Sequence, residues 1–510
     1  NYNELLNSDF EIFFTNVIFF PVYQDDVYTI PFVLALLVGS ALFFTIYFGF
    51  PNVRYFGKAI NTVRGKYDEI EGGHQASETS MTVDGDIRDT IRDESQEGEV
   101  SHFQALATAV SGTVGNGNIA GVALAIALGG PGATFWMIVC GLLGMSSKFV
   151  ECTLGVQYRD VGEDGTVYGG PMYYISKGLK ERGFKTLGKI AAIFFAIFCI
   201  GGSFGGGNAA QSNQATIVLK DLLGLDNAGA GFWIGVVLAV LVGIIIIGGI
   251  KRIASVTEKV VPFMAVFYLL ACLYIIGSNF SLVDDAIGLI ITEAFNPTAI
   301  GVGSLIGVLL VGFKRAAFSN EAGAGSASIA HSAVKTKYSA SEGLVALLEP
   351  FIDTVVICTM TALVIIIFNF GGEFQYGGDG LGGVMIDGVS YEGAGITSKA
   401  FAQYIPYSNV FLTIAVVLFA VSTMISWSYY GLQSWKFLFG RGKAADLAYK
   451  VLFLMFVIIG AAASMGSIWQ FSDAMIFAMI FPNMIGLFFL FPVVKRELKR
   501  FLDAIKEAKA

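Results

Sequence analysis

The sequence predicts an all-α membrane protein that crosses the bilayer many times. Of its 510 residues, 55% are hydrophobic and only 14% are charged, and the mean hydropathy is +0.66. Soluble domains carry about 25% charged residues and about 45–50% apolar residues. The 62 glycines agree with this prediction, because transmembrane helices use glycine more freely than soluble helices do. The composition excludes a secreted disulfide scaffold, a disordered chain and a coiled coil.

About eleven apolar runs are long enough to cross a bilayer as helices, which takes about 20 residues each. They lie near residues 28–50, 103–128, 132–155, 187–217, 231–250, 259–277, 298–334, 344–370, 407–432, 450–468 and 472–494, and the run at 298–334 is interrupted. The start of the chain has an apolar patch with no basic residue before it, so we expect no cleavable signal peptide.

Lysine and arginine lie mostly on one side of the membrane if the spans alternate. Six segments on that side hold 27 of the 32 basic residues, and the opposite side holds only Lys220 and Lys399. The six basic segments are 51–102, 156–189, 251–259, 335–337, 436–450 and 495–510. Because cytoplasmic loops carry the excess of basic residues, we expect a plasma (inner) membrane protein with its N-terminus outside and its C-terminus inside.

Three segments outside the spans are distinct in composition. Residues 51–102 form a predicted cytoplasmic loop, whose acidic and polar part at 67–101 indicates a mobile insertion. Residues 371–405 form a predicted extracellular glycine-rich loop, in which VMIDGVSY is suited to a small hairpin. Residues 495–510 form a predicted basic cytoplasmic tail. Neither loop is large enough for a catalytic domain.

The sequence has no set of residues typical of catalysis, metal binding or nucleic-acid binding. The five cysteines are scattered through apolar runs without a CxxC pair, so we expect buried thiols rather than a zinc site or a redox pair. His74, His102 and His331 lie in predicted loops or near span ends, and no nucleophile–base pair can be assembled around them. With a net charge of −8 and dispersed basic residues, the chain lacks a basic face for nucleic acid. We expect neither an enzyme nor a nucleic-acid-binding protein.

The first informative interruption lies inside the span 103–128. Apolar arms flank the run Gly112–Asn118 (GTVGNGN), which is a poor helix at mid-bilayer. Broken helices occur there only where they face protein or a water-filled cavity, and their freed amides favour anions while their freed carbonyls favour cations. The alternative is a glycine packing face of the small-xxx-small type beginning at Gly117. The amides of Asn116 and Asn118 favour a binding site, because they are costly in lipid without polar partners.

A second interruption lies five spans later, at residues 303–335. It contains Lys314 and Arg315, followed by the run Phe318–Ser326 (FSNEAGAGS). Spans separated by five helices run in opposite directions, as an inverted five-plus-five repeat requires, and paired breaks point to the binding site of a secondary transporter. Either the outer half-helix ends at Lys314 and Arg315 near the inner face, or these cations lie deeper and pair with Glu321.

Further polar side chains at membrane depth have both structural and functional interpretations. They are Lys148 and Glu151 in the third span, Gln211 in the fourth, Asp353 in the eighth, and Ser422, Thr423 and Trp427 in the ninth. Hydroxyls in membrane helices most often bond back to their own backbone, so a site is not required. Charge pairing and snorkelling explain the charged ones, and Lys148 and Glu151, three residues apart, are expected to pair.

Five blocks of sequence, in order between residues 100 and 495, resemble the alanine or glycine:cation symporter family. They are Gly115–Val122 (GNGNIAGV), Gly129–Met137 (GGPGATFWM), Tyr168–Tyr174 (YGGPMYY), Phe318–Gly323 (FSNEAG) and Trp427–Gly431 (WSYYG). The sequence departs from the family pattern at Asn116, where the family usually has threonine, at Ile138, where it has a second tryptophan, and at Leu432, where it has an acidic residue. The departure at Asn116 concerns the substrate pocket.

The resemblance implies a leucine-transporter-like fold, with ten core helices in two inverted repeats and one extra N-terminal helix. The core would occupy residues 103–494 of a single transmembrane transporter domain that spans residues 1–510 and contacts membrane lipid. The implied activity is secondary-active symport by alternating access, in which sodium moves inward with a small neutral amino acid such as alanine, glycine or serine. No cofactor is implied besides the co-transported sodium ion.

The resemblance also implies the residues of a substrate pocket. The backbone amides around Asn116 and Gly117 would hold the substrate carboxylate, and Gln211, Phe318 and Trp427 would line the pocket. Two aromatic walls leave room for a hydrogen or a methyl group, so glycine and alanine should be preferred over leucine. The amide of Asn116 would favour serine or glycine further.

The resemblance places the coupling ion beside this pocket. Carbonyls of Ser111 and Val114 with hydroxyls of Ser422 and Thr423 would form one sodium site, and the Asn118 side chain would face a sodium ion or the substrate. These hard oxygen ligands favour sodium as the coupling ion.

Other readings of the sequence lead to different predictions. The alternative coupling ion is a proton, carried by Glu151, Glu321 or Asp353. A channel would need a continuous ring of identical sites, and an intramembrane enzyme would need a metal set or an activated nucleophile.

Overall fold

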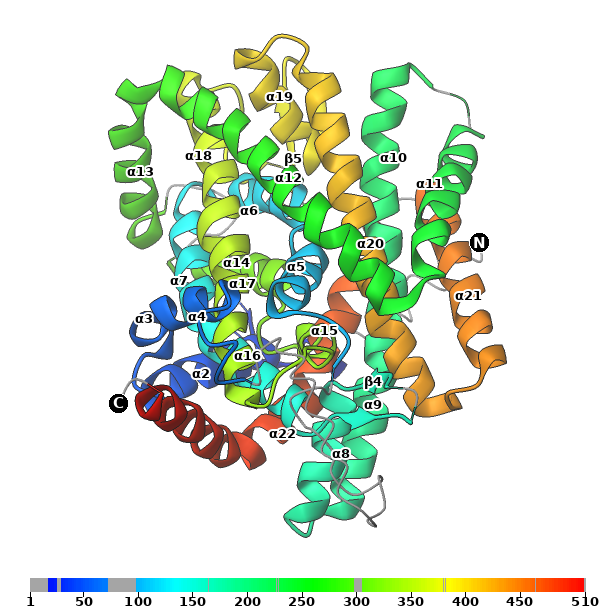
Figure 1. Ribbon diagram of the computed structural model, residues 1–510. Coiled ribbons are helices and arrows are strands. Elements are labelled where there is room, and N and C mark those ends of the chain that lie inside the picture. Colours follow the sequence, from blue (N-terminus) through cyan, green and yellow to red (C-terminus); the bar gives the residue numbers. More distant parts are fainter. Residues whose placement is uncertain are drawn as a thin grey trace, which may run out of the picture.

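The computed structural model describes residues 17–24, 29–71, 98–163, 165–225, 227, 229–297, 305–378, 380, 382–463 and 465–508. Most of the predicted acidic insertion at 67–101 and the first residues of the chain lie outside these ranges. The described chain is a helical bundle with three two-stranded antiparallel hairpins (Figure 1). α13 and α19 lie at one end of the bundle, and α8 and the C-terminal part of α22 lie at the other.

A hairpin and three helices precede the core. They are β1 (Pro21–Gln24), β2 (Thr29–Pro31), α2 (Phe32–Tyr47), α3 (Pro51–Arg54) and α4 (Phe56–Val63). α2 is the extra N-terminal helix that the sequence predicts, and it packs against α7. The described start of the segment 51–102 is helical rather than a loop, since α3 and α4 occupy it and α4 packs against α16.

The first half of the core covers five predicted spans. Its helices are α5 (His102–Thr113), η2 (Gly117–Gly121), α6 (Val122–Gly129), α7 (Gly132–Gln157), α9 (Lys185–Phe204), η3 (Gly205–Ala209), α10 (Ala210–Leu223), α11 (Ala230–Ile246) and α12 (Gly249–Ser278). η2 and η3 are single π-helical turns, a feature that is frequent at functional sites. Between α7 and α9 lie the hairpin strands β3 (Asp160–Val161) and β4 (Val167–Tyr168) and the helix α8 (Pro171–Glu181).

The second half of the core covers the other five spans. Its helices are α14 (Leu305–Asn320), α15 (Ala327–His331), α16 (Ser339–Ala346), α17 (Leu348–Pro350), η5 (Phe351–Cys358), α18 (Thr359–Phe368), α20 (Ser408–Phe439), α21 (Lys443–Ala462) and α22 (Met465–Glu507). Its connecting elements are η4 (Phe280–Leu282), α13 (Val283–Phe295), η6 (Asn369–Gly371), β5 (Gly383–Ile386), β6 (Val389–Glu392) and α19 (Ala394–Tyr404). The VMIDGVSY segment forms the hairpin of β5 and β6, in which Ile386 pairs with Val389.

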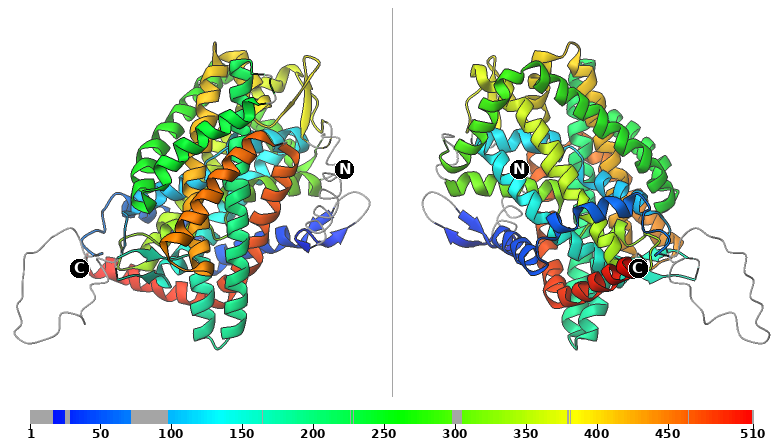
Figure 2. Two further views of the ribbon diagram at one scale, coloured as in Figure 1. Left: turned by 90° about the vertical axis from the view of Figure 1, so that its right-hand side faces the viewer. Right: turned by 60° about the vertical axis from the view of Figure 1, so that its left-hand side comes forward.

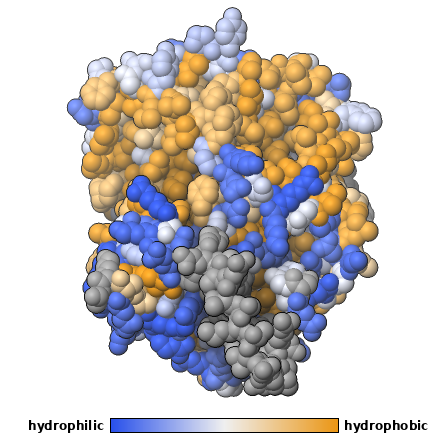
Figure 3. All heavy atoms as spheres, in the orientation of Figure 1, coloured by the Kyte–Doolittle hydropathy of each residue, from blue (hydrophilic) through white to orange (hydrophobic). Residues whose placement is uncertain are grey.

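The described helices account for the predicted spans. Seven helical stretches are long and apolar enough to cross a membrane, and α5 with η2 and α6 makes a further span that is bent by 52°. The remaining predicted spans are the shorter apolar helices α2 and α11 and the interrupted pair α14 and α15. On the face drawn in Figure 3, hydrophobic side chains cover the upper part and hydrophilic ones gather below. The prediction of an all-α polytopic membrane protein is confirmed.

The last helix extends well beyond its predicted span. α22 contains Pro482 and Pro492 and continues through the segment that the sequence predicts as a tail after residue 494. Its C-terminal part turns and lies across the end of the bundle (Figures 1 and 2). α8 and the basic residues of this last stretch lie at the same end, which we call the basic side.

The two interruptions form where glycine and polar residues replace helix formers. α5 ends before Val114, whose backbone is extended (φ −74°, ψ 90°), and the turn η2 begins at Gly117. In the second interruption Glu321, Gly323 and Gly325 have left-handed backbones, with φ of +53°, +94° and +89°. A side chain at either of these glycines would be strained, and its Cβ would lie 2.7–2.8 Å from a neighbouring side chain. Glycine is therefore required at both positions.

Candidate functional site

The two interruptions lie against each other inside the bundle. A Cβ built on Gly117 of η2 would lie 3.7 Å from Ser319 Cα, near the end of α14. The Nδ2 of Asn118 donates to Ser319 Oγ at 3.3 Å, across 201 residues of sequence. The two half-helices on the basic side, α5 and α15, also pack against each other. The broken segments of the two halves therefore share one buried region.

One polar group joins the end of α5 to α20, and we call it the hydroxyl cluster (Ser111, Ser422 and Thr423). Ser111 Oγ donates to Ser422 O at 2.7 Å, and Thr423 Oγ1 donates to Ser111 O at 3.1 Å. Val114 lies one turn further along, and a Cβ at its neighbour Gly115 would contact Thr423 Oγ1. All of these groups are buried. The cluster offers neutral carbonyl and hydroxyl oxygens, the ligands that unwound transporter helices present to sodium.

A second polar group lies on the other side of η2, and we call it the carboxylate cluster (Asn118, Ser319, Asp353 and Thr354). Asp353 Oδ1 accepts from Asn118 Nδ2 at 2.6 Å, and Oδ2 accepts from Ser319 Oγ at 2.8 Å and Thr354 Oγ1 at 2.7 Å. Asp353 is fully buried, and its hydrogen-bond partners in the described part of the chain are all uncharged. A buried carboxylate without a counter-charge is costly, so this cluster is suited to a cation or a proton.

The structure places the predicted sodium ligands in two groups rather than one. Ser111, Ser422 and Thr423 meet in the hydroxyl cluster, whereas Asn118 belongs to the carboxylate cluster. The Oδ1 of Asn118 accepts from the backbone N–H of Gly115 at 2.9 Å, which orients its Nδ2 toward Asp353. The first interruption thus lies between two separate sets of oxygen atoms.

Asn116 and Gln211 bring η2 next to the glycine-rich turn η3. The backbone N–H of Asn116 donates to Gln211 Oε1 at 3.1 Å, and Asn116 Nδ2 donates to the backbone oxygen of Gln211 at 3.3 Å. Gln211 Nε2 is in turn held by Gly206 O at 2.9 Å. Asn116 Oδ1 is buried and has no partner among the described residues. A buried acceptor without a donor is expected where a ligand supplies one.

Both predicted aromatic walls contact η3. A Cβ built on Gly206 would lie 3.6 Å from Phe318 Cζ, and a Cβ on Gly207 would overlap the Trp427 side chain. The Nε1 of Trp427 donates to Glu321 Oε1 at 3.0 Å, so the ring is tied to the second interruption. The glycines of η3 therefore leave the space that the two rings occupy.

An ion-pair group joins α14 to the start of α22. Lys314 Nζ and Arg315 Nη2 lie 3.1 Å and 3.0 Å from Asp473 Oδ2 of α22. Nearby, the rings of Phe318 and Trp469 lie 5.1 Å apart. Neither of the two alternatives for these cations holds, because α14 continues past them to Asn320 and Asp473, not Glu321, provides their counter-charge.

The charged side chains of α7 also have partners other than those expected. Lys148 Nζ lies 3.0 Å from Glu349 Oε1 rather than pairing with Glu151, and Glu151 Oε1 accepts from Asn483 Nδ2 at 2.8 Å. The i, i+3 spacing predicted the wrong partner because α7 turns Lys148 toward α17, which is distant in sequence. Glu321 accepts from Ser326 Oγ in addition to Trp427.

The β3–β4 hairpin closes the basic side of the bundle with exposed charges. Asp160 accepts from Lys177, and its second oxygen lies 2.9 Å from Arg441 Nη2. Partial burial acts to raise the pKa of Asp160, but the hydrogen bonds and charges of Lys177 and Arg441 outweigh it and hold the pKa below its ordinary value. The Arg441 guanidinium also covers the ring of Tyr168 at 3.7 Å. The negative charge of Asp160 is thus balanced by two cations, whereas Asp353 has no such partner among the described residues.

All ten predicted site residues are buried, and they surround the first interruption. Sequence reasoning identified Asp353 as an acid at membrane depth but did not place it in the site, and it missed Ser319 and Thr354. Ser319 lies inside the FSNEAG block, which was a usable signal. The contact between Asn118 and Asp353 joins residues 235 positions apart, and no local pattern predicts such a contact.

Comparisons with known proteins show the family of the chain. The model of the Sodium:alanine symporter family matches residues 15–510. The chain is 40% identical over 481 residues to the Sodium/alanine symporter AgcS of Methanococcus maripaludis, covering 94% of this chain and 96% of that protein. It is 32% identical to the Sodium/proton-dependent alanine carrier protein of a Bacillus species (83% and 93% covered) and 31% identical to the Probable sodium/glutamine symporter GlnT of Bacillus subtilis (93% and 89% covered).

A solved structure has the same overall architecture. MhsT in complex with L-phenylalanine matches with a TM-score of 0.50 at 14% identity, and the match covers 79% of this chain and 99% of that chain. At this identity the likeness concerns the fold alone. The predicted leucine-transporter-like fold is confirmed.

Proposed function

Because the chain belongs to the sodium:alanine symporter family, we propose that it carries a small neutral amino acid, alanine first, across the membrane together with sodium. The family is one of secondary-active transporters, not of enzymes. The observation that carries the proposal is the position of the first interruption between the hydroxyl cluster and the carboxylate cluster. Two sets of oxygen ligands there flank a backbone that is free of regular helical bonding.

The substrate would bind at Asn116 and Gly117. A half-helix N-terminus offers backbone N–H groups to an anion, so the start of η2 would receive the amino acid carboxylate. The unpartnered Oδ1 of Asn116 would accept from the substrate ammonium group. Gln211 Oε1 already accepts a hydrogen bond from the backbone N–H of Asn116. When the carboxylate binds, Gln211 would either move away from this N–H or share it with the carboxylate.

One sodium ion would bind in the hydroxyl cluster. Ser111 O, Val114 O and the hydroxyl oxygens of Ser422 and Thr423 would be its ligands, and the contact between Thr423 Oγ1 and Ser111 O at 3.1 Å supports this set. Because the ligands are neutral, the bound ion keeps its full positive charge there. One sodium ion moving inward contributes about 2.3 kcal/mol per 100 mV of membrane potential.

A second cation would bind at Asp353. The buried carboxylate lacks a counter-charge in the described residues, and Ser319 Oγ and Thr354 Oγ1 lie within hydrogen-bond distance of it. When a cation binds, each hydroxyl can turn its hydrogen away and offer its oxygen. We propose sodium at this position, and a proton on Asp353 is the competing occupant.

The size of the pocket would select the amino acid. Phe318 and Trp427 are the large side chains near Asn116, and they leave room for the methyl group of alanine or for glycine. A hydrophobic pocket discriminates by only about 1–3 kcal/mol per methylene, so larger side chains must be rejected by steric overlap. The side-chain amide oxygen of Asn116 would also accept a hydrogen bond from the hydroxyl group of a serine substrate.

In the proposed orientation the protein lies in the plasma membrane and its basic side faces the cytoplasm. The excess of lysine and arginine in the basic segments predicts this orientation. The N-terminus would then lie outside and the C-terminus inside.

Uptake of radiolabelled alanine into proteoliposomes tests the function. We expect uptake driven by a sodium gradient, abolished when potassium replaces sodium, and competed by glycine and serine but not by leucine. Uptake that persists without sodium and follows a pH gradient would establish proton coupling instead. Uptake driven by no ion gradient would contradict symport.

A further inference from the structure

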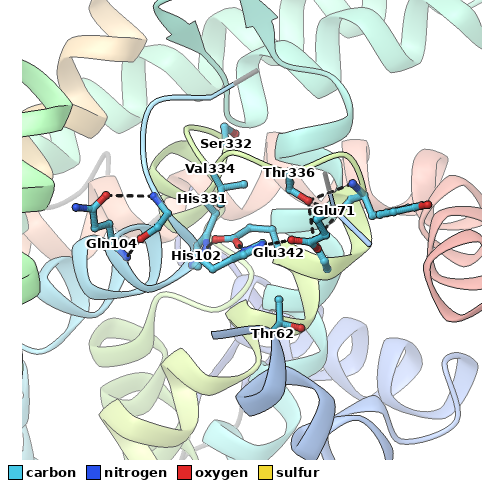
Figure 4. A network of polar contacts seen from close by, with 12 residues as sticks. Thr62, Glu71, His102, Gln104, His331, Ser332, Val334, Thr336 and Glu342 are labelled. Carbon is cyan, nitrogen blue, oxygen red and sulfur yellow. Dashed lines mark hydrogen bonds and ion pairs between the residues drawn. The ribbon is translucent and has the colours of Figure 1, made fainter. Parts of the chain in front are cut away.

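A chain of buried acidic and histidine side chains lies on the basic side of the interruptions (Figure 4). His102 lies between two carboxylates, with Nε2 at 2.6 Å from Glu71 Oε2 and Nδ1 in contact with Glu342 Oε2. The other oxygen of Glu342 lies 2.5 Å from His331 Nδ1. His331 Nε2 lies 3.7 Å from Glu349 Oε2, which is an ion-pair distance but too long for a hydrogen bond. The proposed substrate and sodium sites use none of these side chains.

The members of this network come from the elements that an opening toward the basic side must separate. His102 is the first residue of α5, and His331 is the last residue of α15. α5 and α15 are the half-helices of the two interruptions on this side. Glu342 of α16 contacts both histidines, and Glu71 follows α4. If α5 moves away from α16, the contact of His102 with Glu342 must break. The contact with Glu71 breaks too if the segment after α4 stays with α16, against which α4 packs.

The contacts of His102 require one proton more than neutral histidine supplies. A neutral imidazole has one N–H group, and an ionised carboxylate has none. His102 makes two short nitrogen–oxygen contacts, so a neutral ring could satisfy only one of them. One added proton makes His102 an imidazolium that donates to Glu71 and Glu342. Among the described residues, no group of His, Cys, Asp and Glu side chains is arranged to hold a metal ion instead.

The charges around the network also require added protons. Glu71, Glu342 and Glu349 are three buried carboxylates, and Lys148, at 3.0 Å from Glu349, is the ammonium group beside them. Further titratable groups that face this ion pair are Glu151 and Cys152 of α7, Glu321 at the second interruption and Tyr430 of α20. These groups bring no further positive charge. The positive charge that balances the remaining carboxylates would therefore be carried by protonated histidines.

Several other charged groups on the packed elements are engaged elsewhere. Glu258 of α12 accepts from Gln104 at 2.9 Å, and Arg159 donates to the backbone oxygens of Ser332 and Val334. On α22, Glu497 pairs with Arg500 at 3.4 Å and with Arg496 at 3.0 Å, and Asp353 of η5 lies in the carboxylate cluster. None of these contacts supplies a hydrogen to Glu71 or Glu342.

We propose that Glu71, His102 and Glu342 form a proton-binding site that holds α5 closed, and that the proton enters and leaves on the basic side only. This inference rests on the proposed transport cycle for the meaning of closure. Glu71 is the member next to α4, and its Oε1 is buried with no hydrogen-bond partner among the described residues. Because Glu71 ends the chain of contacts on the side away from the substrate, the proton would enter and leave by way of Glu71. The proton is a regulator of opening and not a transported ion.

The direction of the effect follows from proton linkage. In the closed state the site holds the proton between two carboxylates. In the open state His102 would face water, where histidine has a pKa of about 6.5. The closed state then binds more protons than the open state above about pH 6.5, so alkaline pH on the basic side favours opening and acidic pH favours closure. One proton shifts this equilibrium by up to about tenfold per pH unit.

Histidine NMR tests the proton site without reference to transport. The chain has three histidines, so a protein labelled with ¹⁵N-histidine in nanodiscs gives few imidazole signals. With sodium and alanine present, we expect His102 to be an imidazolium at pH 7.5. Glu71→Gln should shift its titration to lower pH, because the amide can donate to a neutral ring. A neutral His102 at pH 7.5, or an unchanged titration in E71Q, would overturn the proposal.

Transport with separate control of the two compartments tests the regulation. In proteoliposomes sorted with the basic side inward, we expect initial alanine uptake to fall several-fold when internal pH is lowered from 8 to 6. E71Q should flatten this dependence, and the matched control Glu258→Gln should keep it. An equal response to external pH, or acidification of the lumen in proportion to alanine uptake, would contradict the regulatory role. Absence of uptake at any pH would refute the proposed function, while the NMR result would still decide the proton site.

Discussion

The two polar clusters beside the first interruption differ in charge although both are built from oxygen atoms. The hydroxyl cluster contains serine and threonine hydroxyls and backbone carbonyls, and the carboxylate cluster adds Asp353. A cation in the hydroxyl cluster brings a net positive charge into the protein. A cation in the carboxylate cluster removes a net negative charge instead. The two clusters should therefore depend differently on sodium, even though they are held by the same segment of backbone.

The two clusters also differ in the free-energy cost of being without an ion. Neutral hydroxyls without an ion bond to nearby carbonyls, as Ser111 and Thr423 do. Among the described residues, an ionised Asp353 without a bound ion has no counter-charge, and three neutral donors reduce the cost of burying it. We infer that the carboxylate cluster fills at the lower sodium concentration.

Asp353→Asn should have the largest effect. Breaking a buried charge pair by removing one partner costs about 3–5 kcal/mol, so filling the carboxylate cluster should take more than about 100-fold more sodium, and the cluster should stay empty at ordinary sodium concentrations. Sodium titration of alanine uptake measures the change. Asp160→Asn is the matched control, because Asp160 already has Lys177 and Arg441 as partners. Sodium dependence in D353N like that of the wild type would place the second ion elsewhere.

Thr423→Val should have a smaller effect of the same kind. The substitution keeps the shape of the side chain and removes one neutral ligand, worth about 1 kcal/mol, so half-maximal uptake should need roughly fivefold more sodium. The same titration checks it. Thr413→Val on the same helix, whose hydroxyl contacts Val218 O at 3.5 Å, should leave the titration unchanged. If both variants respond alike, the hydroxyl cluster is ordinary helix packing.

Trp427→Ala should change selectivity more than sodium dependence. Removing the ring opens space beside η3 and frees Glu321, so valine or leucine should compete for uptake while alanine binds more weakly. A competition panel on purified protein measures this. Trp435→Ala, two turns further along α20, is the control and should not admit leucine. If W427A still excludes leucine and binds alanine as before, the pocket is misplaced.

Asp160→Asn should have the smallest effect, and it should concern stability alone. The lowered pKa of Asp160 means that its ion pairs stabilise the fold above its ordinary pKa of about 3.8, and that this contribution is lost as the pH falls below that value. Exposed pairs of this kind contribute about 0–1 kcal/mol. Thermal unfolding in detergent should show a slightly lower melting temperature for the variant at pH 7 and a smaller difference near pH 3. A larger difference at low pH would reverse the assigned sign.

Local sequence pattern was enough to find the broken spans. The run GTVGNGN and the glycines around Glu321 cannot continue a helix, and the structure breaks both helices there. The membrane spans could likewise be predicted from the apolar runs and the basic segments between them, because the length of an apolar run is a local property of the sequence. The helices at the start of the segment 51–102 were missed, since that segment was judged by its acidic part.

Pairing between distant segments could not be predicted in the same way. Lys148 was expected to pair with Glu151, three residues away, but Glu349 lies 201 residues away and is its partner. Pairing with Glu321 was one of two alternatives for Lys314 and Arg315, and they pair with Asp473 on the last helix. Such partners depend on how helices pack and rotate, which spacing along one helix does not reveal.

The number of sodium ions moved with each alanine tests the central claim most directly. In proteoliposomes, the membrane potential at which alanine flux reverses gives this ratio at known gradients. We predict two sodium ions per alanine for the wild type and one for Asp353→Asn. A ratio of one in both proteins, or a wild-type reversal potential that follows the pH gradient instead of the sodium gradient, would contradict a sodium ion at the carboxylate cluster.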